Sequence, residues 1–289
     1  MKLALHINDY AGLGAPARMA SALARIARTA EDTGFCRLSL TDHVWQISMI
    51  GEEHEPMLES YTTLGFLAGQ TRTIELQTLV TAATYRPPGL LAKIVTTLDV
   101  LSGGRAWLGI GAGWNEQEAV GLGLPYGQQS ERFARLEETV QICTQMWGEE
   151  QDSFVGEHHQ LASTLNSPQA LSSPRPRILI GGGGERVTLR LAARYADAIN
   201  VYGGPDAGQK VTRLREHCEA VGRDVDEIEK TAFLPIALKT AGDVDRLLDE
   251  LRRLHESEFT TVYGAVADVA ALAPLETLGS KVVPEIAAW

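Results

Sequence analysis

The stretch between Thr73 and Asn115 constrains the fold more than any other part of the chain. It reads as an apolar strand, a helix opened by Pro87 and Pro88, and a second apolar strand that ends among glycines. Parallel strands need a crossover of this kind, and a helix usually supplies it. Glycines at the end of a strand let another group approach the backbone closely. The stretch therefore predicts a strand–helix–strand unit with a contact surface at its carboxyl end.

The same alternation repeats along the whole chain. The expected strands cover 2–7, 36–40, 74–80, 106–110, 178–180, 198–202, 231–238 and 260–263. The expected helices cover 16–33, 58–71, 87–101, 129–147, 185–195, 207–221 and 241–257. Two irregular segments, 44–57 and 148–177, are interpreted as insertions. About eight alternations favour an α/β fold of the (β/α)8 TIM-barrel type over a doubly wound sheet, so we expect one barrel domain over residues 1–289.

Charge and cysteine usage exclude several classes of protein. The net charge is -11 and no basic block occurs, which argues against nucleic acid and against anionic membranes as partners. No apolar run approaches the length of a membrane span, and the chain begins directly with an apolar strand, so no signal peptide is expected. The three cysteines, Cys36, Cys143 and Cys218, are scattered and odd in number. They predict buried thiols in a reducing, cytoplasmic compartment.

In a barrel of this type, function lies at the carboxyl ends of the strands and in the loops that follow them. That rule selects candidate residues directly from the expected strand ends. They are Asn8 and Asp9, Asp42 and His43 with Trp45, Thr78–Thr84, Gly111–Glu116 and Gly181–Arg186.

The four consecutive glycines Gly181–Gly184 give the clearest signal among these candidates. Free amides at the start of a helix bind anions, and glycines let a phosphate reach them. The alternative is a tight strand-to-helix turn. Four glycines cost more conformational entropy than such a turn requires, roughly 0.5–1 kcal/mol each against alanine, so we favour a cofactor phosphate.

Asp42-His43 is the candidate pair for proton transfer. A histidine at a strand end beside a carboxylate is suited to acid–base chemistry near neutral pH. The alternative is a histidine that only hydrogen-bonds a loop. Glu116 is a second catalytic candidate, or an ordinary residue at the start of a helix. His158-His159 has no further ligands at metal spacing, so no metal is expected.

Taken together, these residues resemble the luciferase-like monooxygenase superfamily over about Leu3 to Gly264. Within it, the chain is most similar to the single-barrel oxidoreductases that use the deazaflavin coenzyme F420. The matching motifs are Thr41-Asp42-His43, Leu79-Val80-Thr81 through Thr84-Tyr85-Arg86-Pro87-Pro88, Ser102-Gly103-Gly104-Arg105, Leu108–Glu116, Glu131-Arg132-Phe133, Ile180–Gly184 and Tyr195-Ala196-Asp197.

The resemblance implies a flavin-like ring in the barrel mouth, with coenzyme F420 as cofactor and FMN as the alternative. It implies a non-proline cis peptide at Thr78–Leu79 behind the ring, and His43 as the proton donor. Some members carry an acidic residue directly after the fourth-strand glycines; here that position is Trp114, and Glu116 follows two residues later. The implied cofactor contacts are Asp42, Thr78, Leu79, Thr81, Ala112, Gly113, Gly182, Gly183, Gly184, Arg186 and Val187.

The same resemblance implies an oxidoreductase that moves a hydride between the deazaflavin and a small organic substrate. The alternatives are an FMN-dependent monooxygenase with a separate reductase, and a non-catalytic flavin-binding barrel. Trp45 and Trp114 are candidates for the substrate pocket, and 148–177 is a candidate lid over the barrel mouth. Relatives commonly form homodimers through the barrel helices, so a homodimer is expected.

Overall fold

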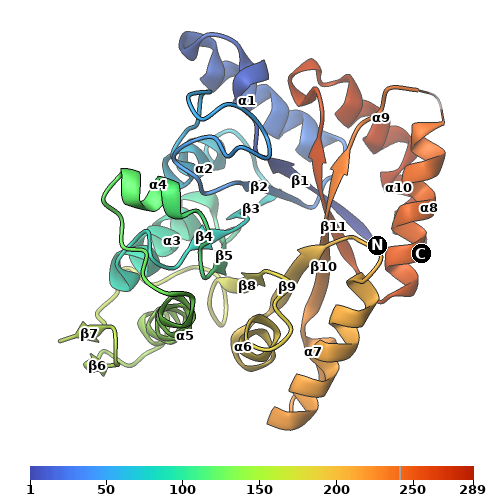
Figure 1. Cartoon of the computed structure of the whole chain (residues 1–289). Coiled ribbons are helices and arrows are strands. Elements are labelled where there is room, and N and C mark those ends of the chain that lie inside the picture. Colours follow the sequence, from blue (N-terminus) through green and yellow to red (C-terminus); the bar gives the residue numbers. More distant parts are fainter. Residues whose placement is uncertain (241) are drawn as a thin grey trace.

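Parallel strands at the centre of the molecule form a nearly closed barrel with helices on its outer side (Figure 1). The computed structural model describes residues 1–240 and 242–289, and in them one sheet has the strand order β3-β2-β1-β11-β10-β9-β8-β5-β4. The strands are β1 (Lys2–Ile7), β2 (Arg37–Leu40), β3 (Glu75–Thr78), β4 (Thr81–Ala82), β5 (Trp107–Gly111), β8 (Arg177–Gly181), β9 (Ala198–Tyr202), β10 (Glu229–Ile236) and β11 (Thr261–Val266). The ring closes because β4 pairs with β5 and a single parallel bridge joins Leu76 of β3 to Ala106. The predicted (β/α)8 barrel is confirmed.

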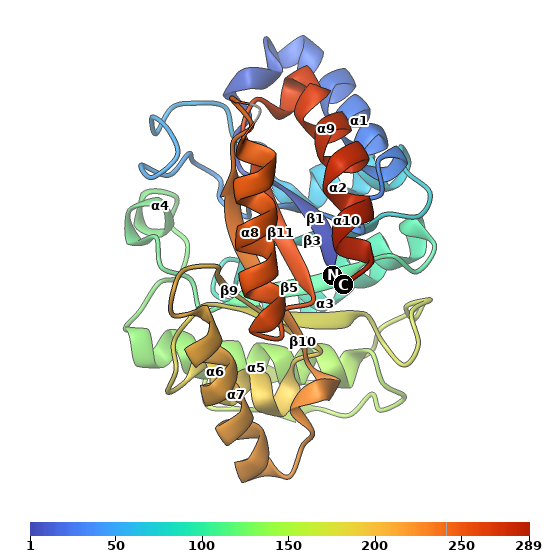
Figure 2. The same ribbon diagram turned by 90° about the vertical axis from the view of Figure 1, so that its right-hand side faces the viewer.

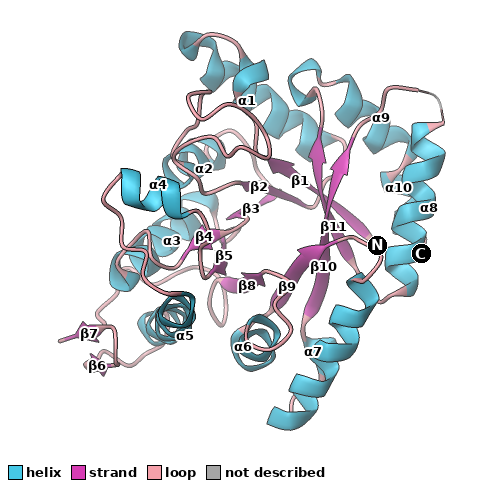
Figure 3. Ribbon diagram, in the orientation of Figure 1, coloured by secondary structure: helices cyan, strands magenta, loops and turns pink. Residues whose placement is uncertain are grey.

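The helices surround this ring, as the secondary-structure colouring makes plain (Figure 3). They are α1 (Pro16–Asp32), α2 (Ser60–Ala68), α3 (Pro88–Ser102), α4 (Glu116–Gly121), α5 (Gln129–Met146), α6 (Thr188–Tyr195), α7 (Ala207–Val221), α8 (Asp243–Glu256), α9 (Ala273–Lys281) and α10 (Val283–Ala287). Local signals explain many of their ends. For example, Pro88 opens α3, and Gly103 ends it with φ of 73°, a conformation that glycine adopts readily.

The alternation of side chains along each strand separates two apolar regions. On β1, Leu3, Leu5 and Ile7 point outward into the large core between strands and helices. Ala4 points inward and packs in a smaller cluster inside the barrel. This inner cluster consists of Ala4, Trp107, Leu179, Ala198 and Tyr263, with Cys36, Leu79, Val80 and Phe233 packed against it.

The two ends of the chain meet at the amino end of the barrel (Figure 2). The amino group of Met1 donates a hydrogen bond of 2.7 Å to the carbonyl oxygen of Ile286 in α10. Neither α9 nor α10 was expected from the sequence, since no strand–helix unit requires them.

Most expected elements lie within three residues of their predicted bounds, and two differences matter for the site. The strand expected over 74–80 is interrupted: β3 ends at Thr78 and β4 begins at Thr81. The helix after the glycines begins at Thr188 instead of Glu185, because residues 185–187 first make a turn. The short helix α4 begins at Glu116, where a helix start was the alternative to a catalytic role. The predicted helix start at Ala241 lies outside the described residues.

The non-proline cis peptide joins Leu79 and Val80, one residue later than predicted. The predicted position, Thr78–Leu79, was wrong by one residue: Thr78 is still paired in register with Leu40 of β2. The Leu79 amide still donates a hydrogen bond of 2.9 Å to the Leu40 carbonyl.

The insertion 148–177 lies along the outside of the barrel, where its hairpin of β6 (Phe154–Val155) and β7 (Gln160–Leu161) is visible beside α5 (Figure 1). Its hydrogen bonds lead to α3 and α5. The buried Asp99 carboxylate accepts from the amides of Leu171 and Ser172 at 2.6 and 2.9 Å, and Glu138 accepts from the amides of 157–159. The insertion therefore braces two helices, α3 and α5, instead of forming the predicted lid over the barrel mouth.

Candidate functional site

The backbone bulge at Leu79–Val80 occupies the barrel mouth because its neighbours are glycines. A Cβ atom on Gly181 would lie 2.7 Å from Val80 Cγ1, and one on Gly111 would lie 3.0 Å from Val80 Cγ2. Both glycines are at strand ends, on β8 and β5. Leu79 and Val80 themselves are half-buried. The arrangement leaves a small apolar surface at the mouth, suited to one face of a flat ring.

Ala112 and Gly113 follow β5 directly beside this bulge. A Cβ on Gly113 would lie 3.1 Å from Ala82 Cβ, and the Gly113 carbonyl accepts a hydrogen bond of 3.2 Å from Arg132 Nε. The structure therefore places Gly113 against Ala82 of β4 and leaves Ala112 half-buried just after β5.

The two threonines that flank the bulge have enclosed hydroxyl groups. Thr78 Oγ1 lies 2.9 Å from Thr81 Oγ1 and donates to the Gly109 carbonyl at 2.9 Å, and Tyr61 Oη lies 2.8 Å from Thr81 Oγ1. Both threonines are fully buried. In this arrangement they support the bulge from behind, and no hydroxyl is directed to the mouth.

His43 is held by a carboxylate that the sequence did not single out. Its Nδ1 lies 2.6 Å from Oε2 of Glu118 in α4, and the Tyr85 hydroxyl donates to the same oxygen at 2.6 Å. Oε1 of Glu118 accepts from the amides of Val44 and Trp45. Burial raises the pKa of Glu118, but the hydrogen bonds from His43, Tyr85 and Val44 outweigh it and hold this pKa below its ordinary value. Glu118 is therefore an ionised, fully partnered carboxylate that fixes the imidazole ring.

The predicted catalytic residue Glu116 lies two positions earlier, with its side chain exposed. It lines a cavity of about 690 Å³ with Val120, Tyr126 and Arg132, away from His43. A sequence signal for Glu118 did exist. Asn115 caps α4 by accepting from the Glu118 amide at 3.4 Å, and a glutamate three residues after a cap is a recurrent helix-start pattern.

The two tryptophans proposed for the substrate pocket differ in their surroundings. Trp114 is exposed and meets the His43 ring edge-on at 5.4 Å between centroids. Trp45 is half-buried, and its ring fills the space that a side chain on Gly121 would need. Only Trp114 presents a free face beside His43.

Asp42 is almost fully buried and engaged in an ion pair. Its carboxylate receives hydrogen bonds from Arg86 Nη1 at 2.6 Å and Nη2 at 3.0 Å, and from the Ser60 hydroxyl. Arg86 also contacts Glu59 at 2.6 Å. Burial alone would lower the pKa of Arg86, but Asp42 and Glu59 raise it above its ordinary value. The predicted cofactor contact at Asp42 would therefore have to share the carboxylate with Arg86 and Ser60.

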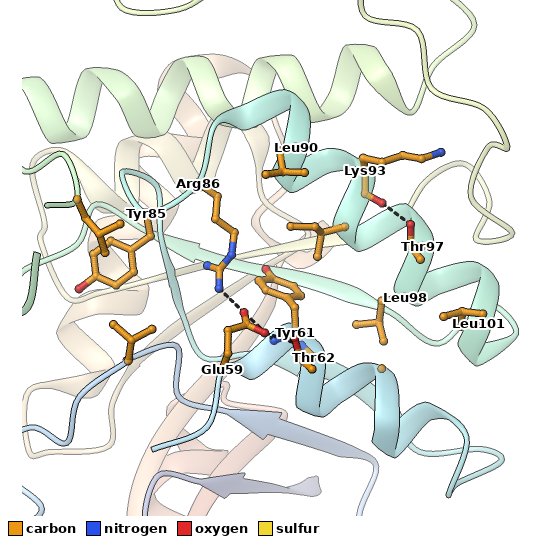
Figure 4. A pocket seen from close by; sticks show the side chains of 14 residues that line it. Glu59, Tyr61, Thr62, Tyr85, Arg86, Leu90, Lys93, Thr97, Leu98 and Leu101 are labelled. Atoms are coloured by element: carbon orange, nitrogen blue, oxygen red, sulfur yellow. Dashed lines mark hydrogen bonds and ion pairs between the residues drawn. The ribbon is translucent and has the colours of Figure 1, made fainter. Parts of the chain in front are cut away.

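Arg86 also lines a groove of about 710 Å³ between α2 and α3 (Figure 4). Its guanidinium carbon lies 4.7 Å from the centre of the Tyr61 ring. Leu90, Leu98 and Leu101 of α3 also line the groove. The groove lies on the outer side of the barrel and does not include the bulge.

The glycine loop after β8 presents unpartnered amides. Gly182 has φ of 126°, a conformation that favours glycine, and its amide donates to the Asn200 carbonyl at 2.9 Å. In the described part of the chain, the amides of residues 183–187 donate to no protein group. Gly182, Gly183, Gly184 and Arg186 are exposed, and Val187 is half-buried. This is the arrangement expected of an anion site.

A cation on α7 lies beside this loop. Lys210 Cε is 3.8 Å from the position of a Cβ on Gly183, and Lys210 Nζ pairs with Glu185 at 2.7 Å. The sequence did not select Lys210, since it lies a whole strand–helix unit away. Thr188, at the start of α6, places its hydroxyl 2.8 Å from the Cβ position of Gly184.

Two further searches of the described residues were negative. They contain no group of three or more His, Cys, Asp or Glu side chains that could hold a metal ion. None of the helices in residues 1–240 and 242–289 is long and apolar enough to cross a membrane.

Comparison with known proteins now identifies the class. The family model for luciferase-like monooxygenases matches residues 5–272, so the chain belongs to this family. It is an oxidoreductase of the luciferase-like class.

Among its relatives is an F420-dependent glucose-6-phosphate dehydrogenase of Nakamurella multipartita, 33% identical over 239 residues that cover 80% of this chain and 67% of the relative. The pyrimidine monooxygenase RutA of Acinetobacter baylyi is 32% identical over 191 residues, which cover 63% of this chain and 50% of that protein. The chain thus spans between half and two thirds of these curated relatives. The coenzyme F420-dependent tetrahydromethanopterin reductase of Methanopyrus kandleri shares the fold, with a TM-score of 0.81, 18% identity and coverage of 99% and 100%.

Proposed function

We propose that this protein is a coenzyme F420-dependent oxidoreductase that transfers a hydride between the deazaflavin and a small organic substrate. The observation that carries the proposal is the row of unpartnered amides at 183–187 at the same barrel rim as the apolar bulge of Leu79 and Val80. An anionic cofactor with a flat ring suits both. The 33% identical F420-dependent relative supports the deazaflavin as that cofactor.

The residues at the rim fit such a cofactor. The amides of 183–187 would hold its phosphate, with Lys210 and Arg186 as the nearest cations. Leu79, Val80, Ala112 and Gly113 would lie against its ring. When bound, a reduced deazaflavin supplies a hydride and reacts poorly with oxygen. The protein supplies orientation, burial and one proton.

His43 is the group that would hold that proton. Its Nδ1 is engaged by Glu118, so Nε2 is the nitrogen available to donate to, or accept from, the substrate. Glu118 fixes the ring orientation, while Tyr85 and two backbone amides fix Glu118. An orienting carboxylate of this kind supports a histidine acting as general acid or base. Glu118 is thus a positioning residue.

Titration of the purified apoprotein with coenzyme F420 and with FMN, followed by fluorescence, tests the proposal. We expect micromolar binding of the deazaflavin and much weaker binding of FMN. Tight binding of FMN alone would overturn the choice of cofactor and would favour the monooxygenase alternative.

That alternative has its own support. RutA is a monooxygenase relative, and the net charge of -11 opposes the polyanionic tail of F420 more than it opposes FMN. A non-catalytic flavin-binding barrel is the third reading. The non-catalytic barrel would be favoured if no turnover were found with either cofactor and the His43→Ala variant bound the cofactor as the wild type does.

We propose further that the protein is a cytoplasmic homodimer. Leu90 and Leu101 on α3 are exposed apolar residues that line the groove of Figure 4, and Phe66 on α2 is exposed as well. Cys143 and Cys218 are buried thiols, which supports a reducing compartment. Light scattering of the wild type and of Leu101→Glu tests the dimer: we expect a dimer for the first and a monomer for the second. A monomeric wild type would contradict it.

A further inference from the structure

A neutral histidine that the proposed chemistry does not use lies at the floor of the barrel mouth. His6 is on β1, two residues after the inward-pointing Ala4, so it also points into the barrel. It is 6% exposed, and its neighbours in register are Ser39 on β2 and Ala265 on β11. Burial, with a smaller contribution from the nearby His43, lowers the pKa of His6 to about 3. The ring therefore carries no charge at neutral pH.

The hydrogen bonds around His6 define which nitrogen carries the proton. The Ser39 hydroxyl donates to the Leu5 carbonyl oxygen at 3.3 Å, so its oxygen is free to accept. His6 Nδ1, 2.9 Å from Ser39 Oγ, is then the donor. In a neutral imidazole the other nitrogen is a bare acceptor. Nε2 of His6 is that acceptor.

Nε2 has no protein partner in the described residues. It is also not one of the fully enclosed polar atoms, so it is reached from the mouth. Because Nδ1 faces β2, Nε2 faces the opposite side of the ring. An acceptor at the floor of a mouth is suited to a ligand that donates an N–H or O–H.

Two aromatic side chains lie between His6 and the rim of the barrel mouth. The Phe233 ring on β10 meets the His6 ring at 5.6 Å and 84°, and the Tyr202 ring on β9 meets Phe233 at 5.6 Å and 87°. Phe233 is half-buried, and Tyr202 is 71% exposed at the rim. We call His6, Phe233 and Tyr202 the aromatic wall.

The aromatic wall faces the bulge across the mouth. In the strand order, β10 is four strands from β3, which is directly opposite in a ring of eight. Phe233, Leu79 and Val80 all pack on the same inner cluster. A flat molecule on the aromatic wall would therefore face a cofactor ring on the bulge.

The aromatic wall also has no cation. None of the cation–π contacts among the described residues involves Phe233 or Tyr202. Arg86 is occupied by Asp42 and Glu59, and Lys210 lies at the glycine loop. None of the three side chains of the aromatic wall is a cation that could pair with a phosphate group.

We propose that the aromatic wall is the substrate subsite, and that it takes an uncharged, flat molecule whose N–H or O–H donates to His6 Nε2. The inference rests on the proposed function, because it assigns the bulge to the cofactor. It favours neutral unsaturated compounds as substrates over sugar phosphates.

Histidine 15N NMR of the apoprotein tests this without any turnover. The probes are three matched pairs, in each of which methylation removes the donor: uracil and 1,3-dimethyluracil, 2-pyridone and N-methyl-2-pyridone, phenol and anisole. Glucose 6-phosphate is the charged comparison. We expect at least one donor to bind roughly tenfold more tightly than its methylated partner and to shift the Nε2 resonance of His6. Binding without preference in every pair, no binding by any probe, or a larger shift with glucose 6-phosphate would overturn the proposal.

Two variants separate ligand binding from a structural role. His6→Gln keeps an acceptor near the Nε2 position and loses the bond to Ser39, whereas His6→Asn keeps a donor toward Ser39 and loses the acceptor. We expect His6→Asn to abolish the donor preference and His6→Gln to retain it. The opposite order, with thermal unfolding more affected in His6→Gln, would mean that His6 acts only through Ser39. Since F420 titration is a separate measurement, failure of the cofactor proposal is distinguishable from failure of this one.

Discussion

The two ends of the barrel are built in opposite ways. At the amino end, Arg37 contacts the carboxylates of Glu75 and Glu229 at 2.8 and 3.4 Å, donates to the Tyr263 hydroxyl at 2.5 Å, and lies 3.7 Å from the centre of the Trp107 ring. Each guanidinium nitrogen of this buried cation has a partner. At the carboxyl end, the amides of 183–187 and Nε2 of His6 have none within the described chain.

This difference separates stability from function along one axis. Arg37, Glu75, Trp107 and Glu229 are the first residues of their strands, so the polar network closes the barrel where each strand begins. The carboxyl end keeps donors and acceptors for a ligand, as barrel enzymes generally do. A substitution at the amino end should therefore affect stability, and one at the carboxyl end should affect ligand binding.

The largest effect is expected at His43. His43→Ala should lower turnover by about 10²–10⁴-fold and leave the Kd of the cofactor within about threefold, because the imidazole supplies a proton and not the cofactor's binding energy. Steady-state kinetics and fluorescence titration measure the two quantities. Loss of cofactor binding together with turnover would contradict a purely acid–base role.

Glu118→Gln tests the residue that fixes His43. We expect turnover to fall about tenfold or more, and to fall at least about tenfold further than in Glu116→Gln, because only Glu118 contacts the imidazole. Equal effects of the two variants would restore Glu116 as the catalytic candidate.

Arg37→Ala should destabilise the polar network at the amino end of the barrel and leave the carboxyl end unchanged. Removal of one partner from a buried ion pair leaves uncompensated charges and costs about 3–5 kcal/mol of unfolding free energy. Urea unfolding measures it, with Arg72→Ala, an exposed arginine, as the control within about 0.5 kcal/mol of the wild type. The cofactor Kd of the folded variant should be unchanged, and a weakened Kd would mean that the ends are coupled.

Gly182→Ala should act at the carboxyl end. Both Gly182 and Gly103 have positive φ, so alanine at either position introduces backbone strain of roughly 1–2 kcal/mol. Only Gly182 belongs to the glycine loop, so we expect a roughly tenfold weaker cofactor Kd for Gly182→Ala and no change for Gly103→Ala. Similar Kd values in the two variants would argue against phosphate binding by the loop.

The smallest effect is expected at Glu31, which accepts hydrogen bonds from the amides of Arg72, Thr73 and Ile74. Burial raises the pKa of Glu31, but these amides lower it to about 2 from 4.5. A carboxylate with a lowered folded-state pKa stabilises the protein above about pH 4.5, and this stability is lost as the pH falls toward 2. The gap in unfolding free energy between the wild type and Glu31→Gln should shrink over that window. A constant gap would contradict it.

Sequence patterns predicted the barrel well because each strand and helix carries its own local signal. The bounds of 198–202 and 207–221 agree residue for residue with β9 and α7. Local signals failed where long-range contacts decide. The cis peptide lies one residue later than predicted, and the insertion lies along α3 because the Asp99 carboxylate accepts hydrogen bonds from the amides of Leu171 and Ser172.

The candidate site could be predicted in outline only, for the same reason. The glycines and His43 are visible at strand ends. Glu118 and Lys210 are not, because their relation to His43 and Gly183 exists only after strands far apart in sequence close into a ring. The alternation on β1 identifies His6 as inward-pointing once the strand is known, but its free Nε2 depends on Ser39.

A crystal structure of the protein with coenzyme F420 tests the central claim most directly. The account predicts the ring against Leu79 and Val80, and the phosphate within hydrogen-bond distance of the amides of 183–187. A cofactor bound in the groove between α2 and α3, or a phosphate away from the glycine loop, would contradict it.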